Sequence, residues 1–362
     1  MRSSDMLASI RAMQLPDFDA EHPLRLMEVC GTHTMAIARA GLRQLLPAHV
    51  KLISGPGCPV CVTPSGAMDA VLTFSMTPGV TLCTYGDLLR VPGTQRGDNL
   101  LARRAKGAKV RAVYSAVDAL DFARENPEQQ VVFLAVGFET TAPGTAACIL
   151  KAEEEGLRNF SVLCLMKYTE PAIRAILADK ACQVGGLICP GHVAAVTGSD
   201  AFSFLPREYG LPAVVAGFEG DDVIRAVYEL CAMRAAGKPD VVNAYRRVVR
   251  EQGNPVAQAM LHQVFEKKDD VWRGLGAIAG SGMAIRHEYA EFDAAKRFGI
   301  SGIDRDAEKT NGCRCGDILR GVLEPAACPL FGRACVPGNP VGPCMVSGEG
   351  ACAAAYKYQG VV

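Results

Sequence analysis

Short apolar runs alternate with segments of helical periodicity over most of the chain. Most of the runs end in a polar or glycine-containing turn, after which a helical segment begins. This alternation is typical of parallel strands joined by covering helices. We therefore predict an α/β fold with two Rossmann-like parallel-sheet domains. The predicted strands are residues 24–29, 50–53, 80–85, 109–114, 131–136, 160–165, 186–189 and 213–216.

The pattern changes after residue 238. Residues 238–270 are more charged and have helical periodicity, whereas residues 274–282 are apolar and glycine-rich and predict a strand and a turn. Farther on, cysteines stand among glycines and prolines with little periodicity. This predicts a C-terminal α/β region that ends in a cysteine-rich segment. The expected domains are residues 1–120, 121–240 and 241–362.

The loop at residues 55–61, Gly-Pro-Gly-Cys-Pro-Val-Cys, follows the predicted strand 50–53. Open α/β sheets carry their chemistry on loops at the carboxyl ends of strands. Cys58 and Cys61 form a C-x-x-C pair, which can close a disulfide or share a metal, and in which one thiolate often has a lowered pKa. The loop is therefore a candidate redox or metal-binding site.

A second thiol follows the predicted strand 24–29, because Cys30 precedes a helix expected over residues 35–45. The positive end of that helix dipole should stabilise a thiolate there. His33 lies three residues on and could reach the same ligand. A capping turn with a solvated histidine is the alternative interpretation. Together with Cys58 and Cys61 on the next loop, these residues favour a soft-metal site.

Two further turns carry polar groups that could face a cleft: residues 139–141, Glu-Thr-Thr, and His192. Helix capping and a solvated histidine explain them as well. The sequence Gly-Phe-Glu occurs at residues 137–139 and again at 217–219, a weak internal echo. No G-x-G-x-x-G follows the first strand and no G-x-x-x-x-G-K-[ST] occurs, so neither dinucleotide nor P-loop binding has support.

Charge and hydropathy exclude some partners. Lys plus Arg and Asp plus Glu both total 38, so nothing in the net charge indicates a nucleic-acid partner. No run approaches the roughly 20 apolar residues that a membrane helix needs. The first residues lack a signal-peptide core, so we expect a cytoplasmic protein.

The chain has 15 cysteines, an odd number in a large protein without an export signal. Metal ligands and redox thiols are therefore expected in preference to a disulfide framework. Five scattered cysteines in apolar surroundings predict buried structural thiols: Cys83, Cys148, Cys164, Cys182 and Cys231.

Six cysteines near the C-terminus stand in glycine- and proline-rich loops of the kind that wrap an inorganic centre. Zinc usually shows two close C-x-x-C pairs, which are missing, whereas an iron–sulfur cluster accepts irregular spacings. The chemistry alone does not select four ligands from the six. They are Cys313, Cys315, Cys328, Cys335, Cys344 and Cys352.

Three signatures together resemble the HypD family of [NiFe]-hydrogenase maturation proteins. The first is Cys-Gly-Thr-His-Thr at residues 30–34, and the second is the loop at residues 55–61 with Pro64. The third is the spacing C-x14-C-x6-C-x16-C formed by Cys313, Cys328, Cys335 and Cys352. The resemblance implies three α/β domains and a [4Fe-4S] cluster on those four cysteines. It leaves Cys315 and Cys344 outside the cluster.

The resemblance also implies a function. With a small HypC-type chaperone, the protein would hold the iron on which the Fe(CN)2CO group is assembled, with cyanide delivered by a HypE-type partner. Cys30 would be the iron ligand, and His33 would orient the thiolate or donate to a cyanide nitrogen. Cys58 and Cys61 would be a two-electron redox pair supplied through the cluster, and Glu349 a carboxylate of the same cleft. Such a protein is an assembly scaffold with redox capacity.

Two alternatives stay open. An iron–sulfur-dependent thiol–disulfide oxidoreductase acting on a partner protein would use the same cysteines, except that it needs no soft-metal site at Cys30 and His33. A structural zinc tail would leave Cys58 and Cys61 unexplained.

Overall fold

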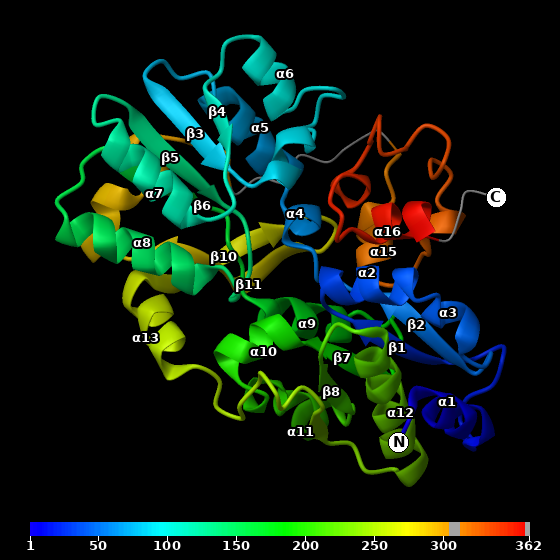
Figure 1. The fold of residues 1–362 in the computed structure, drawn as a ribbon. Helices are drawn as coiled ribbons and strands as arrows, with labels where there is room; N and C mark the ends of the chain where they lie inside the picture. The colour runs from blue at the N-terminus through cyan, green and yellow to red at the C-terminus, as the bar shows by residue number, and fades with distance from the viewer. Residues whose placement is uncertain (304–311, 359–362) are drawn as a thin grey trace.

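Two parallel β-sheets form the body of the protein, and the computed structural model describes residues 1–303 and 312–358 (Figure 1). Both sheets have purely parallel pairing, so the predicted α/β class is confirmed. Sheet A has the order β2 (Val50–Ser54), β1 (Leu24–Glu28), β7 (Gly186–Pro190), β8 (Ala213–Ala216) and β9 (Val241–Asn243). Sheet B has the order β4 (Val110–Ala112), β3 (Val80–Thr84), β5 (Gln130–Ala135) and β6 (Phe160–Cys164).

Helices bury both faces of each sheet, which explains why the strands are almost continuously apolar. One face of sheet A packs against α1 (Ser3–Ala12), α2 (Gly31–Arg39) and α12 (Gly220–Ala236). One face of sheet B packs against α7 (Ala116–Glu125) and α8 (Ala142–Glu154). The remaining faces of both sheets share the largest core, and the five scattered cysteines are buried as predicted.

The other helical elements connect or cover these layers. They are α3 (Leu42–Leu45), α4 (Pro59–Val62), α5 (Ser65–Phe74), η1 (Gly86–Arg90), α6 (Leu100–Ala105), α9 (Thr169–Ala178), α10 (Gly191–Thr197), η2 (Asp200–Phe202), α11 (Phe204–Tyr209), α13 (Pro255–Val264), η3 (His287–Phe292), α14 (Ala294–Arg297), α15 (Cys315–Leu319), η4 (Pro325–Ala327), η5 (Pro343–Met345) and α16 (Ala351–Tyr358).

Sheet A is assembled from two distant parts of the chain. After β2 the chain leaves to build sheet B and then returns as β7, which pairs with β1 in the register Leu26↔Gly186. Residue 120, where a domain boundary was expected, lies in α7, between β4 and β5 of sheet B.

Two helix predictions differ from the structure. The helix expected over residues 35–45 is split into α2 and α3 at Gly41, whose φ of 61° suits glycine. Residues 238–270 were expected to be helical. Helix α13 (Pro255–Val264) confirms part of this range, but β9 and most of β10 (Phe265–Trp272) also lie there. The charged residues of β10 look helical in sequence, yet the strand is held by antiparallel pairing with β11 (Gly276–Ile285).

The cysteine-rich segment lies over one end of sheet A. In Figure 1 this orange and red part of the chain sits beside α4 and above α2. Both neighbours are direct contacts, because α16 packs on α2 and η5 packs on α4. Within the described residues, no helix is long and apolar enough to cross a membrane.

Candidate functional site

The loops that follow β1 and β2 meet backbone to backbone. The Gly31 N–H donates to the Gly57 carbonyl at 3.0 Å. A Cβ on Gly57 would lie 2.1 Å from the backbone nitrogen of Cys30, so only glycine fits there. Gly57, the second glycine of the Gly-Pro-Gly-Cys sequence, therefore allows the disulfide loop to lie against Cys30.

Cys30 caps the N-terminus of α2 and is partly exposed. Its backbone N–H donates to Glu28 Oε2 at 3.2 Å, and the Thr34 hydroxyl donates to Glu28 Oε1 at 2.6 Å. Glu28 is completely buried, and this burial raises its pKa to about 7. The Glu28 carboxyl thus fixes the first turn of α2 from beneath.

The thiol of Cys30 does not have the lowered pKa that the helix dipole alone would give. Burial, and then the negative charge of Glu349, raise the pKa of Cys30 to about 12. The side chain is therefore a protonated thiol in the free protein. A bound metal ion deprotonates a coordinating thiol, which is how such a group becomes a ligand.

Glu349 reaches the same place from the C-terminal segment. Its Oε1 accepts a hydrogen bond from the Thr32 hydroxyl at 2.9 Å. A Cβ on Gly31 would lie 2.4 Å from the Cβ of Glu349, so the two loops are in close contact. Burial, partly offset by the Thr32 bond, raises the pKa of Glu349, and the charge of Asp87 acts in the same direction. Asp87 is held nearby by the Ser347 hydroxyl at 2.9 Å.

His33 is buried, so the interpretation as a solvated histidine is wrong. Its Nε2–H donates to the Gly217 carbonyl at 2.9 Å, and its ring stacks on Phe218 at 4.6 Å. Nδ1 is buried without a hydrogen-bond partner among the described residues. Burial lowers the pKa of His33 to about 4, so the ring is neutral. His192 is exposed and stacks on the same Phe218 ring at 3.9 Å.

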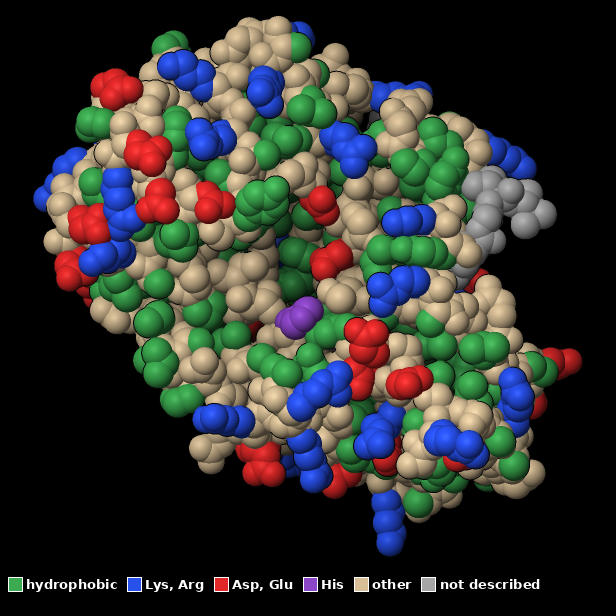
Figure 2. All heavy atoms as spheres, viewed as in Figure 1, with side chains coloured by type: hydrophobic (Ala, Val, Ile, Leu, Met, Phe, Trp, Pro, Cys, Tyr) green, Lys and Arg blue, Asp and Glu red, His purple; other side chains and the backbone are tan. Residues whose placement is uncertain are grey.

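The four loops at the carboxyl ends of β1, β2, β7 and β8 thus gather at one edge of sheet A. Figure 2 shows that the surface is hollowed between the part built on sheet A and the part built on sheet B, with a histidine and acidic side chains at the rim.

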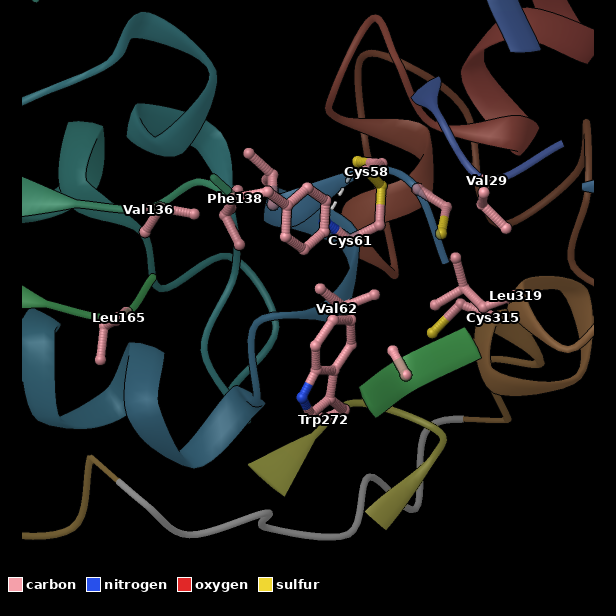
Figure 3. Close-up of a cluster of buried hydrophobic side chains, with 14 of the residues drawn as sticks. Val29, Cys58, Cys61, Val62, Val136, Phe138, Leu165, Trp272, Cys315 and Leu319 are labelled. Carbon is pink, nitrogen blue, oxygen red and sulfur yellow. Dashed lines mark hydrogen bonds between the residues drawn. A yellow bond between two sulfur atoms is a disulfide. The ribbon is translucent and has the colours of Figure 1, made fainter. Parts of the chain in front are cut away.

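Cys58 and Cys61 are joined by a disulfide, and both are buried, with exposed fractions of 3% and 0%. The Cys61 N–H also donates to the Cys58 sulfur at 3.2 Å. Figure 3 shows the disulfide among buried side chains, with Phe138 and Trp272 on one side and Cys315 on the other.

All six C-terminal cysteines line one small cavity. Thiol hydrogen bonds link Cys315 to Cys313 and to Cys344. A Cβ on Gly342 would lie 2.5 Å from the Cys313 sulfur, so a glycine is needed for the cavity wall to close. Cys315 and Cys344, which the spacing pattern leaves outside the ligand set, therefore lie beside the predicted ligands.

The thiols that line this cavity are the type of donor that an iron–sulfur cluster takes. Among residues 1–303 and 312–358, no three histidine, cysteine or carboxylate side chains are arranged to hold one metal ion. The four cysteines of a [4Fe-4S] cluster do not need to converge on one point, because each binds a different iron. A cavity lined by thiols from separate loops meets that requirement.

Among the described residues, Glu139 of the turn after β5 bonds to Thr169 and not to the residues of this site. Glu139 is buried and accepts hydrogen bonds from the backbone N–H and the hydroxyl of Thr169, at 2.8 and 2.7 Å. Its neighbour Phe138 stacks on Trp272 at 5.8 Å, close to the disulfide. The first Gly-Phe-Glu turn thus supports the disulfide side of the core.

Comparison with known proteins agrees with these motifs. The HypD family model, described as "Hydrogenase formation hypA family", matches residues 4–359. The chain belongs to the HypD family. The HypD relative from Azotobacter vinelandii is 48% identical over 94% of this chain and 90% of its own length. The relative from Cupriavidus necator is 45% identical, over 92% of this chain and 89% of its own length. That from Escherichia coli is 44% identical, over 94% and 91%. All three are named hydrogenase maturation factor HypD.

Sequence reasoning missed Glu28, Phe218 and Arg273 as parts of this region. Glu28 could have been noticed, because it is a carboxylate in the apolar strand 24–29. A fully buried charged residue almost always has a bonding partner. The repeated Gly-Phe-Glu turn pointed to Phe218. Arg273 is buried, and its N–H donates to the carbonyl of Val62, next to Cys61. It gave no signal, since its burial depends on β10, which was not foreseen.

Proposed function

We propose that this HypD-family protein is an assembly scaffold that, with a small HypC-type chaperone, holds the iron on which the Fe(CN)2CO group of [NiFe]-hydrogenase is built. The observation that carries the proposal is the close approach of three loops. Gly31 and Gly57 allow Cys30, the Cys58–Cys61 disulfide loop and Glu349 to meet at one edge of sheet A.

In this proposal Cys30 is the ligand that the chain offers to the cargo iron, and the chaperone supplies a second cysteine. A thiolate is a soft donor suited to iron with strong-field ligands. The Glu28 carboxylate holds the backbone of Cys30 in place. Glu349 lies close enough to influence the Cys30 thiol and is a candidate acceptor for the proton that the thiol loses on binding iron.

His33 has a positioning role. Its Nε2–H is used by the Gly217 carbonyl, so in this tautomer it cannot donate through either nitrogen to a cyanide. The bond instead ties the first turn of α2 to the loop after β8, which fixes the direction of the Cys30 side chain. Cyanide itself would come from a HypE-type partner.

In this proposal the Cys58–Cys61 pair exchanges two electrons. Opening the disulfide consumes two electrons and two protons and yields two thiols. A [4Fe-4S] cluster on Cys313, Cys328, Cys335 and Cys352 would supply one-electron redox chemistry when bound. The packing of η5 on α4 supports an exchange of electrons between the two places, because it brings the two segments into direct contact.

The alternative function is a thiol–disulfide oxidoreductase that acts on a protein. The proximity of the disulfide to the six-cysteine cavity favours it as well. It is disfavoured by burial, since exchange with a protein requires a thiolate to reach a sulfur of the disulfide directly. Cys61 is 0% exposed, and its partner is nearly as well covered. The scaffold therefore explains the structure better.

Complementation tests the proposal. A host that lacks its own HypD-family protein is supplied with this chain, with Cys30→Ala, or with Cys231→Ala as a control for a buried thiol on α12. We expect hydrogenase activity to be lost with Cys30→Ala and kept with the control. Full hydrogenase activity with Cys30→Ala would contradict the proposal that Cys30 holds the iron.

A further inference from the structure

Among the described residues, the buried Arg273 guanidinium has no hydrogen-bond partner for either of its terminal nitrogens. The residue follows β10 directly and is 5% exposed. A guanidinium stays protonated in proteins and offers five N–H donors. Burying such a charge without compensation is strongly unfavourable. An anionic group next to the guanidinium would offset this cost.

The backbone around Arg273 contacts the segments that carry both groups of cysteines. The Arg273 N–H donates to the Val62 carbonyl at 2.8 Å, and Val62 follows Cys61. On its other side Gly274, with φ of 78°, lies so close to Gly316 that a Cβ would come within 2.3 Å of the Gly316 Cα. Gly316 follows Cys315, so the backbone at residues 273 and 274 contacts both the disulfide loop and the turn that carries Cys315.

The carboxylates near this position have other partners. Asp270 pairs with the buried Lys167 at 2.6 Å, and Asp317 pairs with Arg314 and Arg320. Across residues 1–303 and 312–358, Arg273 forms no ion pair with a carboxylate. Its charge does act on the cysteines: hydrogen bonding to Cys315 and burial raise the pKa of Cys313, and Arg273 opposes that rise.

We propose that Arg273 is the internal counter-charge of the metal–thiolate group held by the C-terminal cysteines, and that it favours the reduced form of that group. The inference rests on the proposed [4Fe-4S] cluster. Reduction of such a cluster by one electron from an external reductant adds one negative charge, with no bond formed or broken. Net charge and hydrogen bonds to sulfur are among the factors that set cluster potentials. A fixed cation beside the cavity therefore makes reduction easier.

The side chain, and not the backbone, carries this role. The bond to Val62 and the contact with Gly316 involve only main-chain atoms of residues 273 and 274, so they survive a side-chain change. Arg273 therefore acts through its charge. A purely structural residue would not change the reduction potential of the cluster, and its loss would not be rescued specifically by lysine.

The test compares the full chain with Arg273→Gln, Arg273→Lys and the control Lys267→Gln, which removes a charge from an exposed position of β10. Each protein is purified anaerobically, assayed for iron and sulfide, and titrated with dithionite while the reduced cluster is followed by electron paramagnetic resonance. We expect Arg273→Gln to lower the equilibrium constant for reduction at least about tenfold, which is about 59 mV for one electron. Arg273→Lys and Lys267→Gln should stay within about threefold of the unchanged protein, about half that shift.

An unchanged potential in Arg273→Gln, or an equal shift in Arg273→Lys, would overturn the inference. If Arg273→Gln loses the cluster, retention by Arg273→Lys supports the role of the charge, and loss in both variants overturns it. A complete absence of cluster from the unchanged protein would be a different failure, because it removes the proposed cofactor together with the inference.

Discussion

Replacing Gly57 by alanine should damage the site through the backbone alone. The new Cβ would lie 2.1 Å from the Cys30 nitrogen and 2.3 Å from its Cα, whereas ordinary contact begins at 3.4 Å. The two loops would have to separate by more than 1 Å. Gly57 is not among the glycines with positive φ, so the cost is steric and not conformational.

The size of the effect follows from what can move. Overpacking usually costs about 1–3 kcal/mol, and the upper end applies here because the neighbour is main chain and not a flexible side chain. A displacement of about 1 Å at a reacting group can lower activity about a hundredfold. We therefore expect Gly57→Ala to lose about 3 kcal/mol of stability, or to keep its stability by moving the Cys30 loop and to lose most of its maturation activity.

Urea unfolding followed by circular dichroism, together with the hydrogenase activity of a complemented host, measures both effects. Gly144→Ala is the matched control, since this glycine lies in α8 with nothing within 4 Å of a new Cβ. That variant should gain roughly 0.5–1 kcal/mol. If Gly57→Ala equals the unchanged protein in both stability and activity, the argument for direct loop contact is refuted.

Three further predictions concern single groups. The raised pKa of Glu28 means that the folded state holds a proton that the unfolded state releases, so stability should fall as pH rises from about 4.5 and level off above about 7. Glu28→Gln should abolish this decline in unfolding midpoints measured between pH 4 and 8, and an unaltered decline would assign it elsewhere. The double change Cys58→Ala with Cys61→Ala should cost no more than about 2 kcal/mol, since the bridge closes a very short loop, yet it should abolish maturation; retained maturation in the complemented host would exclude a redox role. Cys313→Ala should lose iron and sulfide on anaerobic purification and Cys315→Ala should keep them, and the reverse pattern would show that the ligands were wrongly assigned.

The apolar periodicity was sufficient to predict the strands of both sheets up to β8, because strands buried on two faces are nearly continuous apolar runs. It also placed Cys30 and Cys58 at strand ends. It could not show that β1 pairs with β7, since a sequence pattern does not name a strand's neighbour. Strand β10 was missed, although a strand and a turn were expected at residues 274–282. Its charged residues are tolerated because β11 pairs with it and because Lys167, which is distant in sequence, pairs with Asp270.

The sequence motifs named residues that the structure brings together, but they did not predict the electrostatics. The structure places Glu349 next to the Cys30 loop, as expected. The pKa of Cys30 was expected to fall because it caps a helix, but burial and Glu349 outweigh the dipole. Those two factors come from the C-terminal segment folding over α2, which no local pattern reveals.

The central claim is that Cys30 holds an iron that carries cyanide and carbon monoxide. The measurement that tests it most directly is an infrared spectrum of the protein purified anaerobically from a host that also makes a HypC-type chaperone. The account predicts bands of metal-bound cyanide and carbon monoxide that vanish in Cys30→Ala and persist in Cys231→Ala. Bands that survive in Cys30→Ala, or no bands from a complex with an intact cluster, would contradict it.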